Sequence, residues 1–314
     1  MAEIYFAGGC FWGVEHFFKG VDGVSSAVPG YANGLTENPS YREVYTDTTG
    51  FAETVRVVYN PTRVSLSRLV KFFFAIIDPL SLNRQGHDEG TRYRTGVFYT
   101  DASDLPVLEN EFELVSAELG QSPVTELCPL RNFYPAEDYH QDYLDKNPSG
   151  YCHLPLKVFK YLRLFQDIEL FLGPEPDLIA RMANMAALIH HRMHFFWTGF
   201  YLVRDSELVL GPFQGPEACF RIGFGKGVCG TAWAQDRTLV VPDVEQFPGH
   251  IACSSLSRSE IVIPLRKAPS GPRHSRPDRE SPAGIIGVLD IDSTELDTFD
   301  SFDATWLGLI TTLL

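Results

Sequence analysis

The chain has 314 residues, 44% of them hydrophobic, and a formal net charge of −14 at pH 7. This length exceeds the usual size of a single hydrophobic core and predicts two domains. The acidic balance argues against nucleic acid or an anionic membrane as a main partner.

The first predicted elements are a strand and a helix with a cysteine between them. The apolar run at residues 4–7 is strand-like, residues 14–18 are helix-like, and Gly8-Gly9-Cys10-Phe11-Trp12-Gly13 joins them. We expect the free N–H groups and the dipole at the helix start to favour the thiolate of Cys10, which is the nucleophilic form. The neighbouring rings of Phe11 and Trp12 suit a small apolar or thioether-like group.

Strands and helices alternate through the rest of the first half. Residues 55–59 and 96–99 read as strands, and Ser65 is placed to cap a helix with apolar residues on one face. A second helix, with apolar positions from Leu105 to Leu119, follows. This alternation predicts an open α/β sandwich.

The same half resembles the A-type peptide-methionine sulfoxide reductases. The resemblance rests on Gly9-Cys10-Phe11-Trp12-Gly13 and on residues 38–44, 52–53, 86–94, 134–141 and 147–152. It implies that Cys10 attacks the sulfoxide sulfur and that Glu53, with a pKa raised by an apolar pocket, gives the oxygen a proton. Cys152 would then resolve the sulfenic acid on Cys10 as a disulfide. The implied substrate-binding residues are Phe11, Trp12, Tyr41, Asp88 and Tyr93, although Asp88 alone could equally be a turn residue.

A domain boundary is expected after Cys152. We predict a first domain at 1–163, a helical connector at 164–175 and a second domain at 176–314, because Gly173-Pro174-Glu175-Pro176 interrupts the helical pattern. Asp177 would cap a helix ending near Met193. Predicted strands follow at 198–203, 207–210, 218–222, 239–241, 260–264 and 284–290, with a proline-rich, disordered loop at 267–282.

Residues 225–230 satisfy the G-x-G-x-x-G pattern of dinucleotide-binding loops. The surrounding elements do not alternate strand and helix as a dinucleotide-binding βαβ fold requires. We therefore interpret the run as a glycine-rich turn into a short helix, with the Cys229 sulfur near its N-terminus.

The second half resembles the free-methionine-(R)-sulfoxide reductases, which are catalytic members of the GAF fold. The matching runs are 197–201, 210–215, 218–219, 227–232, 249–253, 259–262 and 287–293. With the first half, this resemblance implies an α/β (α+β) fold class: an open α/β sandwich followed by a GAF domain whose sheet is mainly antiparallel and flanked by helices. The resemblance implies Cys253 as the attacking sulfur, Cys219 as resolver, and Cys229 as a third thiol that relays or attacks instead. Glu260, Asp290 and Asp292 would surround the ammonium and the sulfoxide oxygen, and Trp197 and Tyr201 would shape the methyl pocket.

Together the resemblances imply a bifunctional, thioredoxin-dependent oxidoreductase. The first domain would reduce methionine-S-sulfoxide, peptide-bound or free, and the second free methionine-R-sulfoxide. No bound cofactor is expected, since thioredoxin would deliver electrons that come indirectly from NADPH. The alternatives are a single reductase with a ligand-sensing GAF domain and a protein that uses its thiols only as switches.

The six cysteines fit redox chemistry better than a disulfide framework, because no signal peptide is recognisable and a cytoplasmic location follows by default. No Cys-x-x-Cys pair occurs, so we expect no zinc site. Cys128, in a strand-like run, is interpreted as structural.

Overall fold

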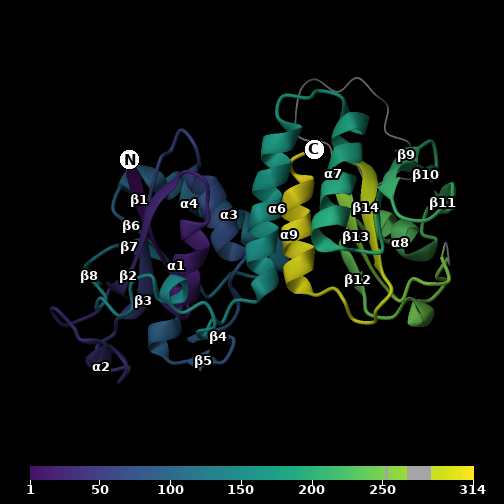
Figure 1. The fold of residues 1–314 in the computed structure, drawn as a ribbon. Helices are drawn as coiled ribbons and strands as arrows, with labels where there is room; N and C mark the ends of the chain where they lie inside the picture. The colour runs from purple at the N-terminus through teal and green to yellow at the C-terminus, as the bar shows by residue number, and fades with distance from the viewer. Residues whose placement is uncertain (252–253, 267–283) are drawn as a thin grey trace. The chain divides into compact units, whose positions relative to one another are not determined.

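A computed structural model describes residues 1–251, 254–266 and 284–314 (Figure 1). The predicted loop at 267–282 and Cys253 lie outside the described residues. The chain divides into two compact units, Met1–Leu162 and Arg163–Leu314. The helix α6 (Leu156–Leu172) crosses this division, so helical structure begins before the connector predicted at 164–175.

Unit 1 is built on a six-stranded sheet in the order β7-β6-β1-β3-β2-β8. Its strands are β1 (Ala2–Gly8), β2 (Val24–Ala32), β3 (Ala52–Tyr59), β6 (Thr95–Tyr99), β7 (Glu126–Pro129) and β8 (Phe133–Pro135). All neighbouring strands pair antiparallel except β6 and β7. A separate two-stranded ribbon joins β4 (Arg84–Gln85) to β5 (Asp88–Glu89).

The helices of unit 1 include α1 (Phe11–Lys19), α2 (Tyr41–Val44), α3 (Leu66–Phe74), α4 (Leu105–Leu119) and α5 (Tyr143–Lys146). Phe6 of β1 stacks on Phe18 of α1 and on Phe73 of α3, so α1 and α3 cover the same face of the sheet. The helix that the sequence predicts after Ser65 forms, and the Ser65 side chain accepts the Arg68 N–H as its cap. The predicted α/β sandwich is confirmed.

Two glycines let distant segments close around Cys10. Gly9 has φ +83°, and a Cβ there would lie 2.6 Å from Gln85. A Cβ at Gly13 would lie 3.1 Å from His153 and 3.2 Å from the Cys152 Sγ. Because Gly9 and Gly13 have no side chain, the segment that contains Cys152 and His153 can lie directly against the start of α1.

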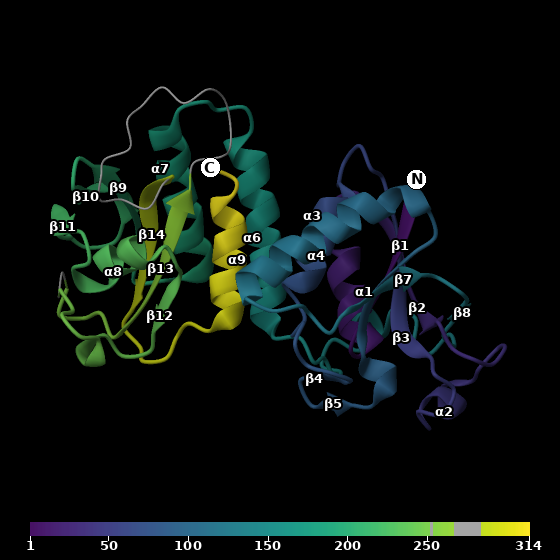
Figure 2. The ribbon, with the colours of Figure 1, turned by 180° about the vertical axis from the view of Figure 1, so that it is seen from behind.

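Unit 2 contains a second six-stranded sheet, in the order β11-β10-β9-β14-β13-β12, with every neighbouring pair antiparallel. The strands are β9 (Trp197–Arg204), β10 (Glu207–Gln214), β11 (Arg221–Gly223), β12 (Leu239–Val241), β13 (Ser259–Arg266) and β14 (Ile285–Ser293). In Figures 1 and 2, α7 (Leu178–Met193) and α9 (Ser301–Thr311) lie on one side of this sheet and α8 (Gly227–Gln235) on the other. The strand-rich second half is thus confirmed.

The glycine-rich run at 225–230 leads into α8, as the sequence predicts. Its neighbours β11 and β12 belong to an antiparallel sheet rather than to a βαβ unit, so the dinucleotide-binding interpretation fails on topology. Among the described residues, no helix is both long and apolar enough to cross a membrane.

Candidate active sites

Cys10 occupies the N-cap position of α1 and is 6% exposed. The charge of Glu53 acts on the Cys10 thiol, and the pairing of β3 with β2 places Glu53 opposite Tyr31. The Glu53 carboxylate accepts the Phe11 N–H at 3.1 Å, in a buried hydrogen bond. One turn of α1 therefore carries both the thiol and the donor that positions the carboxyl group.

Burial raises the pKa of Glu53 to about 8, although the Phe11 N–H and the charge of Arg92 oppose the rise. The carboxyl group is therefore mostly protonated at neutral pH and available as an acid. The direction agrees with the sequence prediction. A neutral Glu53 also removes a negative charge from the neighbourhood of Cys10.

The thiol of Cys10 differs from the sequence expectation. Burial first, and then the charge of Glu53, raise the pKa of Cys10 well above its ordinary value, while the backbone hydrogen bond from Trp12 lowers it. The helix start does supply the expected donor, but desolvation outweighs it. The prediction that this position favours the thiolate in the free protein is wrong.

The aromatic residues that the sequence singled out gather around this carboxyl group and thiol. Charges on Glu53 and Cys10 contribute to raising the pKa of Tyr41 to about 12, with burial the larger cause. The pKa of Tyr93 also rises, by burial and then by the charge of Glu53. Trp12 stacks on Tyr143 with ring centroids 3.7 Å apart.

Cys152 is half-buried, and burial raises the pKa of its thiol. Charges on Cys152 and on Asp88 both contribute to raising the pKa of Cys10. Both residues, which the sequence predicts as partners of Cys10, therefore lie close to its thiol. The structure thus brings Cys10, Glu53 and Cys152 together from three segments distant in the sequence. Cys128, by contrast, lies in β7 and accepts a hydrogen bond from the Asn33 side chain at 3.5 Å.

Sequence reasoning missed several side chains that support the first site. Glu137 accepts the Tyr31 hydroxyl at 2.7 Å and the Tyr41 N–H at 2.8 Å. The Trp12 indole N–H donates to His140 at 3.1 Å. Glu137 and His140 lie within the block at 134–141, so the signal was present, but their roles depend on tertiary contacts.

A second candidate site lies in a cavity of unit 2 that is partly open to solvent. Asp290 and Asp292 stand two apart on β14, and Glu260 of β13 pairs with Asp292, which puts the three carboxyl groups on one face of the sheet. All of them line the cavity, and so do Cys229, Trp197 and Tyr201.

The carboxyl groups of this cavity cannot all ionise. Burial, followed by the charges of neighbouring acids, raises the pKa values of Glu260 and Asp290 well above their ordinary range, and burial raises that of Asp292 to about 6. The Cys229 thiol lies 3.8 Å from Glu260. The cluster therefore holds at least one proton at neutral pH, next to a sulfur atom.

The remaining residues predicted for the second site are placed as follows. The Tyr201 hydroxyl donates to the Cys219 carbonyl at 3.0 Å, and Cys219 is disulfide-bonded. The Trp197 indole N–H donates to the Pro216 carbonyl at 3.0 Å. Cys253, the predicted attacking sulfur, lies outside the described residues.

Comparison with known proteins identifies the family of the first unit. Residues 2–166 match the family described as peptide methionine sulfoxide reductase. This chain belongs to the peptide methionine sulfoxide reductases. The enzyme named peptide methionine sulfoxide reductase MsrA of Clostridium acetobutylicum is 50% identical over 160 residues, which cover 51% of this chain and 99% of that protein.

Two solved structures are each similar to about half of this chain. One is Mxr1 of Saccharomyces cerevisiae, 43% identical with a TM-score of 0.46, covering 48% of this chain and 87% of the other. Another is the free methionine-R-sulfoxide reductase of Neisseria meningitidis, 48% identical with a TM-score of 0.42, covering 49% of this chain and 84% of the other.

Proposed function

We propose that unit 1 reduces methionine-S-sulfoxide, in peptides or as the free amino acid. The observation that carries this proposal is the buried, protonated Glu53, fixed by the Phe11 N–H one residue from the Cys10 thiol. A sulfoxide bound there would meet a sulfur nucleophile and a proton donor at once. The membership of this chain in the peptide methionine sulfoxide reductases supports the same reaction.

The chemistry balances with the residues present. The Cys10 sulfur bonds to the sulfoxide sulfur as Glu53 gives the oxygen a proton, and the thiol proton of Cys10 passes to the carboxylate that this leaves on Glu53. The hydroxyl group then moves from the substrate sulfur to the Cys10 sulfur as the bond between the two sulfur atoms breaks, which releases methionine and leaves a sulfenic acid on Cys10. Attack by the Cys152 thiol on the sulfenic sulfur, with transfer of its proton to the leaving hydroxyl group, then forms a disulfide and releases water.

A dithiol protein of the thioredoxin class would reopen the disulfide, and no bound cofactor is needed for this cycle. The hydroxyl groups of Tyr41 and Tyr93 would hold the sulfoxide oxygen, and Phe11 and Trp12 would hold the methyl group. These assignments rest on the family motifs and on the grouping of these side chains around Glu53.

For unit 2 we propose reduction of free methionine-R-sulfoxide. The supporting observation is a cavity in which a thiol, Cys229, faces carboxyl groups that retain a proton. The acidic groups that line this cavity favour a substrate that carries a free ammonium group, as a free amino acid does. Since each sulfoxide epimer needs its own pocket, the two units would together reduce both.

The second candidate for unit 2 is a ligand sensor that regulates unit 1. The same cavity would then bind methionine or a similar molecule without turnover. The position of the Cys229 thiol, 3.8 Å from Glu260 in the carboxyl cluster, favours the reductase.

The experiment measures turnover of each separate epimer, with a chemical dithiol as reductant, for the wild type and for Cys10→Ser, Cys229→Ser and Cys253→Ser. Loss of the S epimer only in Cys10→Ser, and of the R epimer only in a unit 2 variant, supports both proposals. If the wild-type chain does not reduce the R epimer, the result supports the ligand-sensor function of unit 2 instead.

A further inference from the structure

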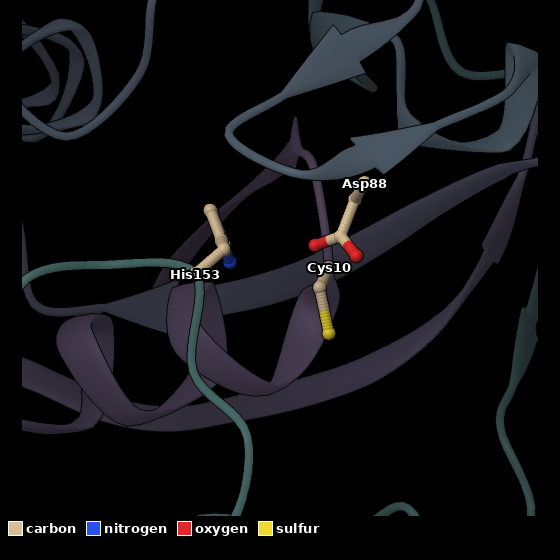
Figure 3. A group of neighbouring side chains, drawn as sticks. All are labelled: Cys10, Asp88 and His153. Atoms are coloured by element: carbon tan, nitrogen blue, oxygen red, sulfur yellow. The ribbon is translucent and has the colours of Figure 1, made fainter.

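Three side chains from distant segments converge beside the start of α1. They are Cys10 of the N-cap, Asp88 of β5, and His153, which follows the predicted resolving cysteine (Figure 3). One ligand atom from each, a sulfur, a carboxylate oxygen and a ring nitrogen, lies within 4.8 Å of the other two. Nothing in the proposed reduction uses His153.

The imidazole of His153 is held in one tautomer. Its Nε2 lies 3.0 Å from the Gly8 carbonyl, which has no hydrogen to give, so Nε2 carries the proton and donates it. The other nitrogen, Nδ1, is left with a free lone pair. Within the part of the chain that the structure describes, Nδ1 is buried and has no hydrogen-bond partner.

Asp88 presents a comparable unsatisfied group. Its Oδ2 is buried and also has no hydrogen-bond partner among the described residues. A buried polar atom left in this state costs about 1–3 kcal/mol. Asp88 and His153 each carry one such acceptor, and a carboxylate oxygen and a ring nitrogen of these two residues lie within 4.8 Å of the Cys10 sulfur, so a cation among the three side chains would give them a partner.

The donor set selects the kind of cation. Calcium and magnesium require many oxygen ligands, whereas sulfur, nitrogen and oxygen in one small site suit Zn²⁺. A histidine that ligates a metal usually donates its second ring N–H to a backbone carbonyl, which is the arrangement of His153 and Gly8. Three protein ligands would leave one position of a tetrahedral zinc ion open.

We propose that Cys10, Asp88 and His153 form a binding site for Zn²⁺ or a similarly thiophilic divalent cation. Binding forms a metal–sulfur bond and releases the Cys10 proton, with no change of oxidation state. Where the proposed function holds, the ion occupies the attacking sulfur and inhibits the S-epimer reaction reversibly. The binding itself does not depend on that function.

This proposal differs from the expectation of no zinc site, which rested on the absence of closely spaced cysteines in the sequence. The ligands stand at positions 10, 88 and 153, and only the folding of the β4–β5 ribbon and of the segment after Cys152 onto α1 brings them together.

The test uses the full chain, reduced and freed of reductant. Because Cys229, Glu260 and Asp290 also lie within 4.8 Å of one another, the background carries Cys219→Ser, Cys229→Ser and Cys253→Ser, which remove the thiols of unit 2. Co²⁺ is added as a spectroscopic probe for thiolate–metal charge transfer, and Zn²⁺ affinity is measured by competition with a chromophoric chelator.

We expect one Co²⁺ per chain with a thiolate charge-transfer band that further replacement of Cys10 by Ser abolishes. His153→Gln and Asp88→Asn should each weaken Zn²⁺ binding more than about 10-fold. Cys128→Ser is the matched thiol control, and it should change neither the charge-transfer band nor the Zn²⁺ affinity. Circular dichroism verifies that each variant is folded.

An unchanged band in the folded Cys10→Ser variant, or Zn²⁺ affinity equal in the His153→Gln variant and its background, overturns the proposal. Should the triple background not fold, the Co²⁺ difference spectrum between the wild type and the single Cys10→Ser variant decides. Absence of a thiolate band in that difference also overturns the proposal.

Discussion

Replacing Glu53 by glutamine should stabilise the protein while it removes activity. Glutamine keeps the size of the side chain and an oxygen to accept the Phe11 N–H, but it has no proton to transfer. A general acid contributes about 10²–10⁴-fold to a reaction rate. We therefore expect kcat/KM for methionine-S-sulfoxide to fall by a factor in that range.

The gain in stability follows from the pKa of Glu53, which is about 8 in the folded chain against an ordinary value of 4.5. Each tenfold change in proton affinity corresponds to about 1.4 kcal/mol, so the ionised carboxyl group is disfavoured in the folded state by about 5 kcal/mol at most. Below pH 4.5 both states hold the proton and the folded state loses nothing. As the pH rises to about 8, the unfolded chain releases the proton first, and stability falls.

The assay is chemical denaturation of the full chain, compared between the wild type and Glu53→Gln over this pH range. The free-energy difference should be nearly constant below pH 4.5, widen in favour of the variant with rising pH, and level off above pH 8. Glu109→Gln, at an exposed position of α4, serves as the control and should show no such divergence. A difference independent of pH, or one that favours the wild type at pH 8, would refute the reasoning.

Three further predictions concern single residues. Cys152→Ser should release about one methionine per chain and then stop, leaving a Cys10 sulfenic acid that dimedone labelling and mass spectrometry detect; continued turnover at the rate of a Cys128→Ser control would contradict the assigned role. Trp12→Phe removes the indole N–H that bonds His140 and part of the methyl pocket, so steady-state kinetics should show KM for the S epimer raised about tenfold, with the R epimer unaffected. Asp290→Asn removes a buried acid whose pKa is raised by burial and by Asp292, so calorimetry at pH 7 should show a higher unfolding temperature than for the wild type; an unchanged or lower one counts against a protonated cluster.

Sequence reasoning located the groups whose identity is fixed by local motifs. Cys10 was identifiable because two glycines and the start of a helix surround it, and Glu53 because it belongs to one of the family motifs, at residues 52–53. The strands and helices followed from periodicity, since the alternation of apolar residues largely determines which face of β1 or α3 is buried.

The parts that could not be predicted depend on contacts between distant segments. The pKa of Cys10 is set by how deeply α1 is covered, which no local pattern records. His153 had no visible role until its Nε2 was found on the Gly8 carbonyl, 145 positions away in the sequence. The same holds for Glu137, whose two hydrogen bonds reach Tyr31 and Tyr41.

The central claim is that each unit reduces its own epimer with its own sulfur. The most direct measurement is the amount of methionine formed from separated free S and R epimers by wild-type chain, Cys10→Ser, and the double variant Cys229→Ser/Cys253→Ser. The account predicts that Cys10→Ser keeps R turnover and loses S turnover, and that the double variant does the reverse. Loss of both epimers in the folded Cys10→Ser variant, or survival of R turnover in the double variant, would contradict it.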